Sequence, residues 1–151
     1  MGRRELTRAV ASPSHPLTGG CLCGAVRYEI DAPLVAAGYC HCTRCQRRTG
    51  TAASAQARVA PGSLRIVAGD SLLKAWRPPE GFEKVFCSRC GSSMLSRDPD
   101  DVEQVFVRLG TFDGDPGIRP AYRQRVETAA VWEPLPEDGL PRYEGPAPRA
   151  G

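Results

Sequence analysis

The chain has 151 residues, with 20 Lys+Arg against 17 Asp+Glu and a formal net charge of +3. This length fits one domain with room for a hydrophobic core, and the 16 glycines, 14 prolines and 7% aromatic residues favour short strands and turns over a helical bundle. No apolar stretch approaches the ~20 residues of a membrane-spanning helix, and the charge is too small to indicate nucleic-acid binding by itself.

The two ends of the chain differ in composition from the middle. Residues 1–17 mix basic, small and proline residues without periodicity and predict a flexible leader. They contain no continuous apolar run of the kind found in secretory signal peptides, which favours a cytoplasmic protein. Residues 144–151 are rich in Pro and Ala and predict a flexible tail, so the expected domain covers residues 18–143.

Strands dominate the predicted secondary structure of this domain. Polar and apolar residues alternate over 25–30 and predict a strand, and residues 34–39 predict a second strand that ends at Cys40. The polar, basic stretch 43–49 predicts a single helical turn. Further strands are expected at 51–59, 63–68, 71–76, 102–109 and 121–132, with a hairpin at 83–96 and a loop at 113–120. Together these elements predict a mainly β, single domain of short antiparallel sheets.

Seven cysteines form three groups, Cys21-Leu-Cys23, Cys40-His-Cys42-Thr-Arg-Cys45 and Cys87-Ser-Arg-Cys90. Close pairs of thiols are typical of metal sites, because one short turn then supplies two ligands. The odd number of cysteines, the missing signal peptide and the Cys-x-Cys spacing argue against a disulfide framework. A thioredoxin-like redox role is less favoured, since neither Cys-x-x-Cys pair lies between a strand and a long helix. Clustered thiolates suit zinc, which we expect as the cofactor.

The simplest division of the seven ligands is four plus three, with two zinc ions per chain. The pairs Cys21/Cys23 and Cys87/Cys90 would form a closed, structural site, because four thiolates leave no position for a substrate. The remaining trio, Cys40, Cys42 and Cys45, would hold a catalytic zinc with an open fourth position.

Two other arrangements of these ligands stay open. In one, His41 or His15 closes the second site, although His41 lies between two ligands and is expected to point away from the metal. In the other, Cys42/Cys45 and Cys87/Cys90 form a zinc ribbon, which would leave three cysteines without a role.

The three cysteine motifs and their flanking glycines resemble the glutathione-dependent formaldehyde-activating enzyme family, also called the GFA or centromere-protein-V domain. The resemblance runs from about Gly19 to Tyr143 and includes Gly19-Gly20-Cys21-Leu-Cys23-Gly24 and Phe86-Cys87-Ser-Arg-Cys90-Gly91. It implies a β-tent-like fold with a structural zinc and a catalytic zinc, divided among the cysteines as above. The chain departs from the family at Arg123-Gln-Arg-Val-Glu127, where many members carry a histidine-led apolar strand, in a region expected to shape the substrate cleft.

A zinc held by three thiolates is electron-rich and suits the binding of an incoming thiol as its thiolate. Together with the resemblance, this predicts a carbon–sulfur lyase similar to S-(hydroxymethyl)glutathione synthase. Such an enzyme forms or cleaves the S-hydroxymethyl adduct of a glutathione-like thiol and a small aldehyde such as formaldehyde. The alternative is a non-catalytic zinc module that binds a protein or, less favourably, a nucleic acid.

Polar residues around the trio have two interpretations each. Three arginines can either pair with the carboxylates of a glutathione-like tripeptide or lie solvated in the loop, namely Arg44, Arg47 and Arg48. The same two interpretations, contact with the ligand or a solvated position, apply to Gln46.

The two tryptophans and the acidic residues give weaker indications. Trp76 and Trp132 can wall a cleft but are expected in the core of so aromatic-poor a protein. Glu83, Asp98 and Asp113 have no spacing that singles out a general base, so none is predicted.

Overall fold

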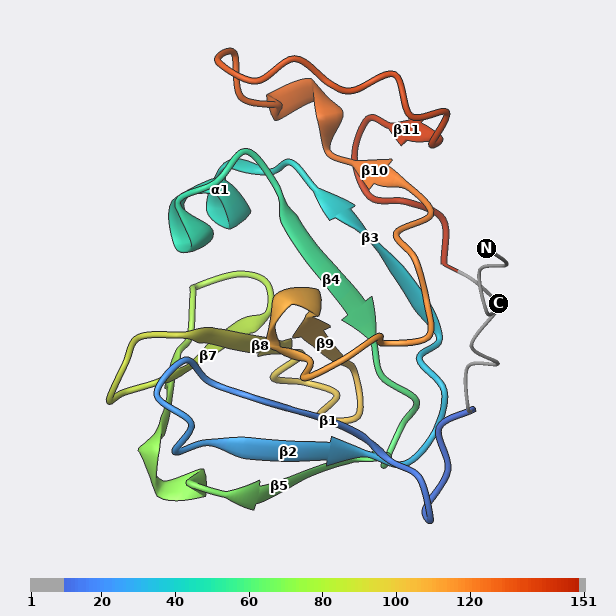
Figure 1. Ribbon diagram of the computed structural model, residues 1–151. Helices are drawn as coiled ribbons and strands as arrows, with labels where there is room; N and C mark the ends of the chain where they lie inside the picture. The colour runs from blue at the N-terminus through green and yellow to red at the C-terminus, as the bar shows by residue number, and fades with distance from the viewer. Residues whose placement is uncertain (1–9, 150–151) are drawn as a thin grey trace.

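The computed structural model describes residues 10–149, and strands are the main element of this part of the chain (Figure 1). Its one α-helix is α1 (Thr43–Thr49), and short 3-10 helices cover Asp70–Leu72, Leu109–Thr111 and Val126–Thr128. The strands are β1 (Leu17–Gly20), β2 (Arg27–Ile30), β3 (Ala36–Cys40), β4 (Ser54–Arg58), β5 (Leu64–Ala68), β6 (Leu73–Trp76), β7 (Glu83–Cys87), β8 (Ser93–Arg97), β9 (Val105–Arg108), β10 (Arg123–Gln124) and β11 (Arg142–Tyr143). The predicted mainly β fold is confirmed.

The smaller sheet has three antiparallel strands in the order β1-β2-β5, seen at the bottom of Figure 1. Close packing here depends on Gly19, which faces Tyr28 across the β1–β2 pair. A Cβ on Gly19 would lie 2.3 Å from the Tyr28 hydroxyl and 2.4 Å from the carbonyl oxygen of Thr111. A glycine is therefore needed for the tyrosine to fit beneath β1.

The larger sheet has eight strands in the order β11-β10-β3-β4-β9-β8-β7-β6. Five of its seven pairings are antiparallel, but β10 pairs in parallel with both β3 and β11. The predicted antiparallel arrangement thus holds for most of this sheet, and β10 adds a parallel edge to it. Parallel neighbours require long connections, and here residues 41–122 connect β3 to β10 while residues 125–141 connect β10 to β11.

The hydrophobic core lies where β2 packs against the strands β7, β8 and β9. Val26, Tyr28 and Ile30 contribute fully buried side chains from the smaller sheet, and Met94 and Val107 contribute them from the larger one. Burial of each such side chain stabilises the folded state by roughly 1.5–3 kcal/mol before the entropic cost is counted. The two sheets therefore share one apolar interior.

Three local predictions need correction. The expected strand at 71–76 begins with a 3-10 turn, and only Leu73–Trp76 is extended. The expected strand at 121–132 is limited to Arg123–Gln124, because a 3-10 turn follows and residues 129–136 are irregular. Trp76 and Trp132 are 58% and 64% exposed, so neither tryptophan belongs to the core.

The ends of the predicted domain contain structure of their own. β1 begins at Leu17, inside the expected leader, of which residues 1–9 lie outside the described range. In the expected tail, the Gly145 N–H donates to the Glu127 carboxylate and the Ala147 N–H donates to the Gln124 side-chain oxygen. None of the helices within residues 10–149 has the length and apolar character needed to cross a membrane.

Candidate metal centres and the adjoining cavity

Four cysteines that are distant in sequence meet between the two sheets. The Sγ atoms of Cys21, Cys23, Cys87 and Cys90 all lie within 4.8 Å of one another. Four thiolates at about 2.3 Å from a central zinc require such mutual distances, so this group, which we call the four-cysteine cluster, fits a tetrahedral zinc ion. The zinc-ribbon alternative is wrong, because Cys42 and Cys45 belong to a different group.

Two tight turns shape the four-cysteine cluster. Gly24 and Gly91 follow the two cysteine pairs, both with φ of 78°, and their N–H groups donate to the carbonyls of Cys21 and Cys87. The left-handed conformation favours glycine and lets each turn present both sulfurs to one side. Ser92 lies with its hydroxyl 3.2 Å from the Cys90 sulfur and lowers the pKa of Cys90 to about 5, which favours the thiolate that a metal needs.

The trio comes together at the junction of β3 and α1. Cys40 ends β3, Cys42 caps α1 and Cys45 lies in its first turn, with all three Sγ atoms within 4.8 Å of one another. The Cys42 sulfur accepts the backbone N–H of Cys45 at 3.3 Å, which orients the thiol at the helix start. The trio therefore depends on one short turn, as its spacing predicts.

Hydrogen bonds within the trio favour one thiolate, that of Cys45. Bonds from the thiols of Cys40 and Cys42 lower the pKa of Cys45 to about 2, and the same contacts raise the pKa of Cys40. The positive charge of Arg108 also lowers the pKa of Cys45. Three clustered sulfur ligands are the donor set that zinc prefers, so the chemistry of the three side chains fits the metal.

No fourth protein ligand joins the trio among residues 10–149. His41 is 3% exposed and its Nε2 accepts a hydrogen bond from Arg123 Nη1 at 3.1 Å, so its ring points away from the trio, as expected. Burial and the charge of Arg123 lower the pKa of His41 and keep the ring neutral. His15 bonds to Ser14 instead. The fourth coordination position is thus free of described side chains.

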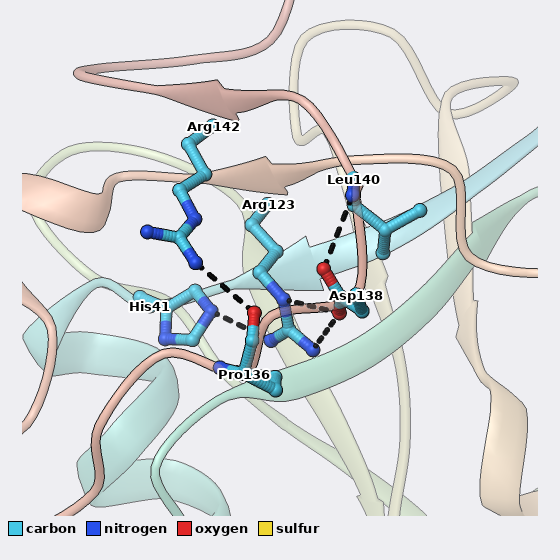
Figure 2. A network of polar contacts seen from close by, with 6 residues as sticks. All are labelled: His41, Arg123, Pro136, Asp138, Leu140 and Arg142. Carbon is cyan, nitrogen blue, oxygen red and sulfur yellow. Dashed lines mark hydrogen bonds and ion pairs between the residues drawn. The ribbon is translucent and has the colours of Figure 1, made fainter.

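Figure 2 shows the network of polar contacts around His41. The guanidinium of Arg123 lies between His41 and Asp138, to whose carboxylate it donates from Nε at 3.0 Å and from Nη2 at 2.8 Å. Arg123 also stacks over the Tyr39 ring, with its guanidinium carbon 4.3 Å from the ring centre. The segment that departs from the family pattern therefore begins with a buried arginine that braces the strand leading into the trio.

A cavity of about 1160 Å³ opens beside the trio, on the larger sheet. Cys40, Cys42 and Cys45 line it together with residues from β4, β7, β8 and β9. Its far side is formed by residues 118–128 and by the segment 146–149. The volume accommodates a small peptide-sized ligand next to the three sulfurs.

The cavity wall carries many more positive than negative side chains. Two carboxylates, those of Glu80 and Glu127, contribute to it. The positively charged residues of the wall are Arg44, Arg58, Lys84, Arg108, Arg119, Arg125 and Arg149. Such an excess suits an anionic ligand.

Of the three arginines next to the trio, one lines the cavity, one is exposed to solvent and one binds the neighbouring strands. Arg44 lines the cavity and donates to the Glu80 carbonyl at 2.7 Å, whereas Arg47 is exposed and does not line it. Arg48 points into the sheet, where it donates to the carbonyls of Val85 and Leu95. Gln46 also serves the local structure, since its amide donates to the carbonyls of His41 and Thr128.

The acidic side chains singled out in the sequence lie away from the cavity. Glu83 pairs with Arg97, and Asp113 pairs with Arg27. Lys84, Arg108 and Arg125 were missed as cavity residues, because a charged residue in a short strand or loop carries no motif that distinguishes it from a solvated one.

Two comparisons relate the chain to known proteins. Residues 16–128, which include all seven cysteines, match the family model described as glutathione-dependent formaldehyde-activating enzyme. A crystal structure of a Rhodobacter sphaeroides protein, a structural-genomics target, is similar with 25% sequence identity and a TM-score of 0.52 over 84% of this chain and 99% of that one. A search of curated proteins gives no match.

Proposed function

Because the chain belongs to the glutathione-dependent formaldehyde-activating enzyme family, we propose that it forms or cleaves the S-hydroxymethyl adduct of a glutathione-like thiol and formaldehyde. The observation that carries this proposal is the trio, whose three sulfurs lack a fourth protein partner among the described residues and open onto a cationic cavity. A small-molecule cavity beside reactive ligands favours an enzyme over a binding module.

The trio is the proposed catalytic metal site. A zinc ion held there would supply a coordination position at which a substrate thiol loses its proton and becomes a nucleophile. The reaction joins the substrate sulfur to the aldehyde carbon and leaves a hydroxyl group on that carbon, and the reverse reaction breaks the same carbon–sulfur bond. Cys40, Cys42 and Cys45 would hold this zinc beside the cavity, where it could bind the reacting sulfur.

The cationic wall of the cavity would bind the rest of the thiol substrate. Glutathione carries two carboxylates, and guanidinium groups pair with carboxylates through two parallel hydrogen bonds. Arg44, on α1, and Arg125, directly after β10, both line the cavity. They are the proposed partners of the two carboxylates, which would orient the sulfur toward the trio.

The four-cysteine cluster is the proposed structural site. All four coordination positions would be filled by Cys21, Cys23, Cys87 and Cys90, so a zinc ion there has no position for a substrate. Its role would be to join the turn after β1 to the turn between β7 and β8.

The test combines zinc analysis with the kinetics of adduct formation. We expect two zinc equivalents in protein purified without chelator, and faster exchange between glutathione and its S-hydroxymethyl adduct in an NMR exchange experiment than without protein. Cys42→Ser should lose one zinc and at least about 100-fold of the catalysed rate, because the reacting sulfur is no longer activated. Cys23→Ser, the matched change in the four-cysteine cluster, should lower stability more than the rate of the folded protein. If Cys42→Ser were as active as the wild type, the proposal would be wrong.

A further inference from the structure

Lysine is rare in this chain and one of its lysines lies in the cavity wall. Of the 20 basic residues, Lys74 and Lys84 are the two lysines, and the rest are arginines. Lys74 is exposed on the edge strand β6, whereas Lys84 lies on β7 and lines the cavity. An arginine does not release its proton in a protein, but a lysine does once its surroundings disfavour the charge. Lys84 is therefore the cavity cation suited to proton transfer.

The strands place Lys84 next to the trio. It pairs with Ser96 across the β7–β8 ladder, and the Ser96 hydroxyl accepts hydrogen bonds from Arg48 at 2.8 Å and from Arg108 at 3.1 Å. Arg48 belongs to α1, the helix that carries Cys45, and its bonds to the carbonyls of Val85 and Leu95 fasten that helix to β7 and β8. Lys84 and the trio thus face the same cavity from adjoining elements.

Positive charge around Lys84 is not balanced by acidic side chains. Arg108 is 6% exposed, its Nε has no hydrogen-bond partner in residues 10–149, and its other donors reach Gln56 and Ser96, which are neutral. Within the same described residues the Lys84 ammonium has no hydrogen-bond or ion-pair partner. Buried donors without an acceptor favour a ligand that brings a negatively charged oxygen.

The groups that face Lys84 act on its pKa in opposite directions. Burial of the half-buried side chain has the largest effect and lowers the pKa. Cys45 and Cys42 raise the pKa through their negative charge, while Arg48 and Arg108 lower it. The net effect is a lowered pKa, which brings the ammonium closer to the range in which general acids and bases work.

The other titratable groups of the cavity are less suited to donate a proton. The Gly145 N–H lowers the pKa of Glu127, so its carboxyl group stays ionised. Burial raises the pKa of Tyr122, which makes its phenol a weaker acid. His41 is not part of the cavity wall and bonds to Arg123.

On the basis of the proposed function, we propose that Lys84 is the catalytic residue that donates a proton to the oxygen of the S-hydroxymethyl adduct and removes it in the reverse reaction. In the forward direction the sulfur–carbon bond forms, the carbonyl π electrons move to oxygen, and the Lys84 ammonium gives that oxygen a proton. The thiol releases its proton to solvent, and the neutral Lys84 amine then takes up a proton from solvent, so the numbers of protons balance. In reverse, the neutral amine removes the hydroxyl proton as the carbon–sulfur bond breaks and the thiolate leaves.

The decisive comparison is between Lys84→Arg and Lys84→Met, with Lys74→Met as the matched control. Lys84→Arg keeps the positive charge but has no releasable proton, so both changes at position 84 should slow the catalysed initial rate by roughly 100- to 10,000-fold. Zinc content, Tm and glutathione binding by calorimetry should stay at the wild-type level in Lys84→Arg. Lys74→Met should behave as wild type, because its side chain is exposed and does not line the cavity.

The pH profile gives a second readout. Formation requires the ammonium form, so the advantage of the wild type over Lys84→Arg should fall as the pH rises through the lowered pKa of Lys84. Wild-type activity in Lys84→Arg would overturn the proposal, because charge alone would then suffice, and would leave the proposed function standing. A wild-type protein that binds glutathione but never accelerates adduct formation would overturn both.

Discussion

At the scale of single residues, the positively charged side chains beside the cavity differ from those on the surface in the partners that they have. Beside the cavity, Arg48 and the cavity-lining Arg108 donate to one shared hydroxyl, and the negative charge of Cys45 offsets part of the repulsion between these two cations. On the surface, charges pair conventionally, as in Arg27–Asp113 beside β1 and β2. Lys84 and Arg108, which have no carboxylate partner among residues 10–149, thus line the cavity, whereas a pair such as Arg27–Asp113 stabilises the fold.

Asp113 illustrates the stabilising kind and leads to a prediction about pH. Hydrogen bonds from Arg27 and Thr18 lower the pKa of Asp113 to about 2, against about 3.9 in an unfolded chain. The lowered value means that Asp113 stabilises the fold above the unfolded pKa and that this contribution is lost as the pH falls toward about 2. Asp113→Asn should thus be less stable than wild type at pH 7, with a difference that shrinks below about pH 4 in urea unfolding.

The matched control for Asp113→Asn is removal of its partner. Arg27→Met should flatten the same part of the pH profile, and the double variant should add little to either single change. Parallel profiles for wild type and Asp113→Asn between pH 7 and about 2 would show that the pair contributes nothing.

At the scale of elements, the four-cysteine cluster joins parts of the chain that share few other polar contacts. Leu22 donates its N–H to the Ser92 hydroxyl at 2.9 Å, and beyond this the two turns meet mainly through the sulfurs of their cysteines. A metal ion bound by these four sulfurs would therefore hold β1 and β2 in place relative to the β7–β8 hairpin.

Loss of metal from the four-cysteine cluster should lower the thermal stability of the protein more than loss of metal from the trio. Cys87 is fully buried at the centre of the four-cysteine cluster, so Cys87→Ser or chelation of that site should lower Tm by about 10 °C or more, which corresponds to ~3 kcal/mol or more. Cys42→Ser, in the trio, should lower Tm by much less. Thermal unfolding followed by circular dichroism measures both, and equal shifts in the two variants would contradict the division of roles.

The elements also show which parts of the fold were predictable. The cysteine groups could be predicted, because metal ligands that share a turn are close in sequence. The strand Arg27–Ile30 could be predicted as well, because alternating polar and apolar residues indicate a strand buried on one face. β10 and β11 were not, because two-residue parallel pairings have no period of their own and depend on the long return of the chain. Lys84 and Arg108 were missed for a related reason: their role comes from strands brought together by the fold.

At the scale of the whole molecule, the C-terminal segment completes the cavity that the larger sheet begins. The Arg125 N–H donates to the Gly145 carbonyl, and Arg125 has a φ of 58°, which is uncommon for a residue with a side chain. Ala147 binds the Gln124 side chain, and Arg149 lines the cavity. Residues 144–149 thus hold β10 and its neighbours in the conformation that faces the trio.

Deletion of residues 144–151 should separate ligand binding from metal binding. Zinc content should stay unchanged, because all the cysteines are retained, while glutathione should bind about 10-fold more weakly through the loss of Arg149 and the release of Arg125. Titration calorimetry and zinc analysis of the shortened chain check this. Unaltered affinity would mean that the segment covers the cavity without contributing to binding.

The separation of the cysteine groups along the chain has a consequence for biosynthesis. The trio is complete once residue 45 has left the ribosome, whereas the four-cysteine cluster must wait for Cys90. At roughly 5–20 residues per second, Cys21 and Cys23 spend several seconds as an unfinished half-site. The trio can therefore bind a metal ion before the four-cysteine cluster can. The thiols of Cys21 and Cys23 must stay reduced until Cys87 and Cys90 have been synthesised.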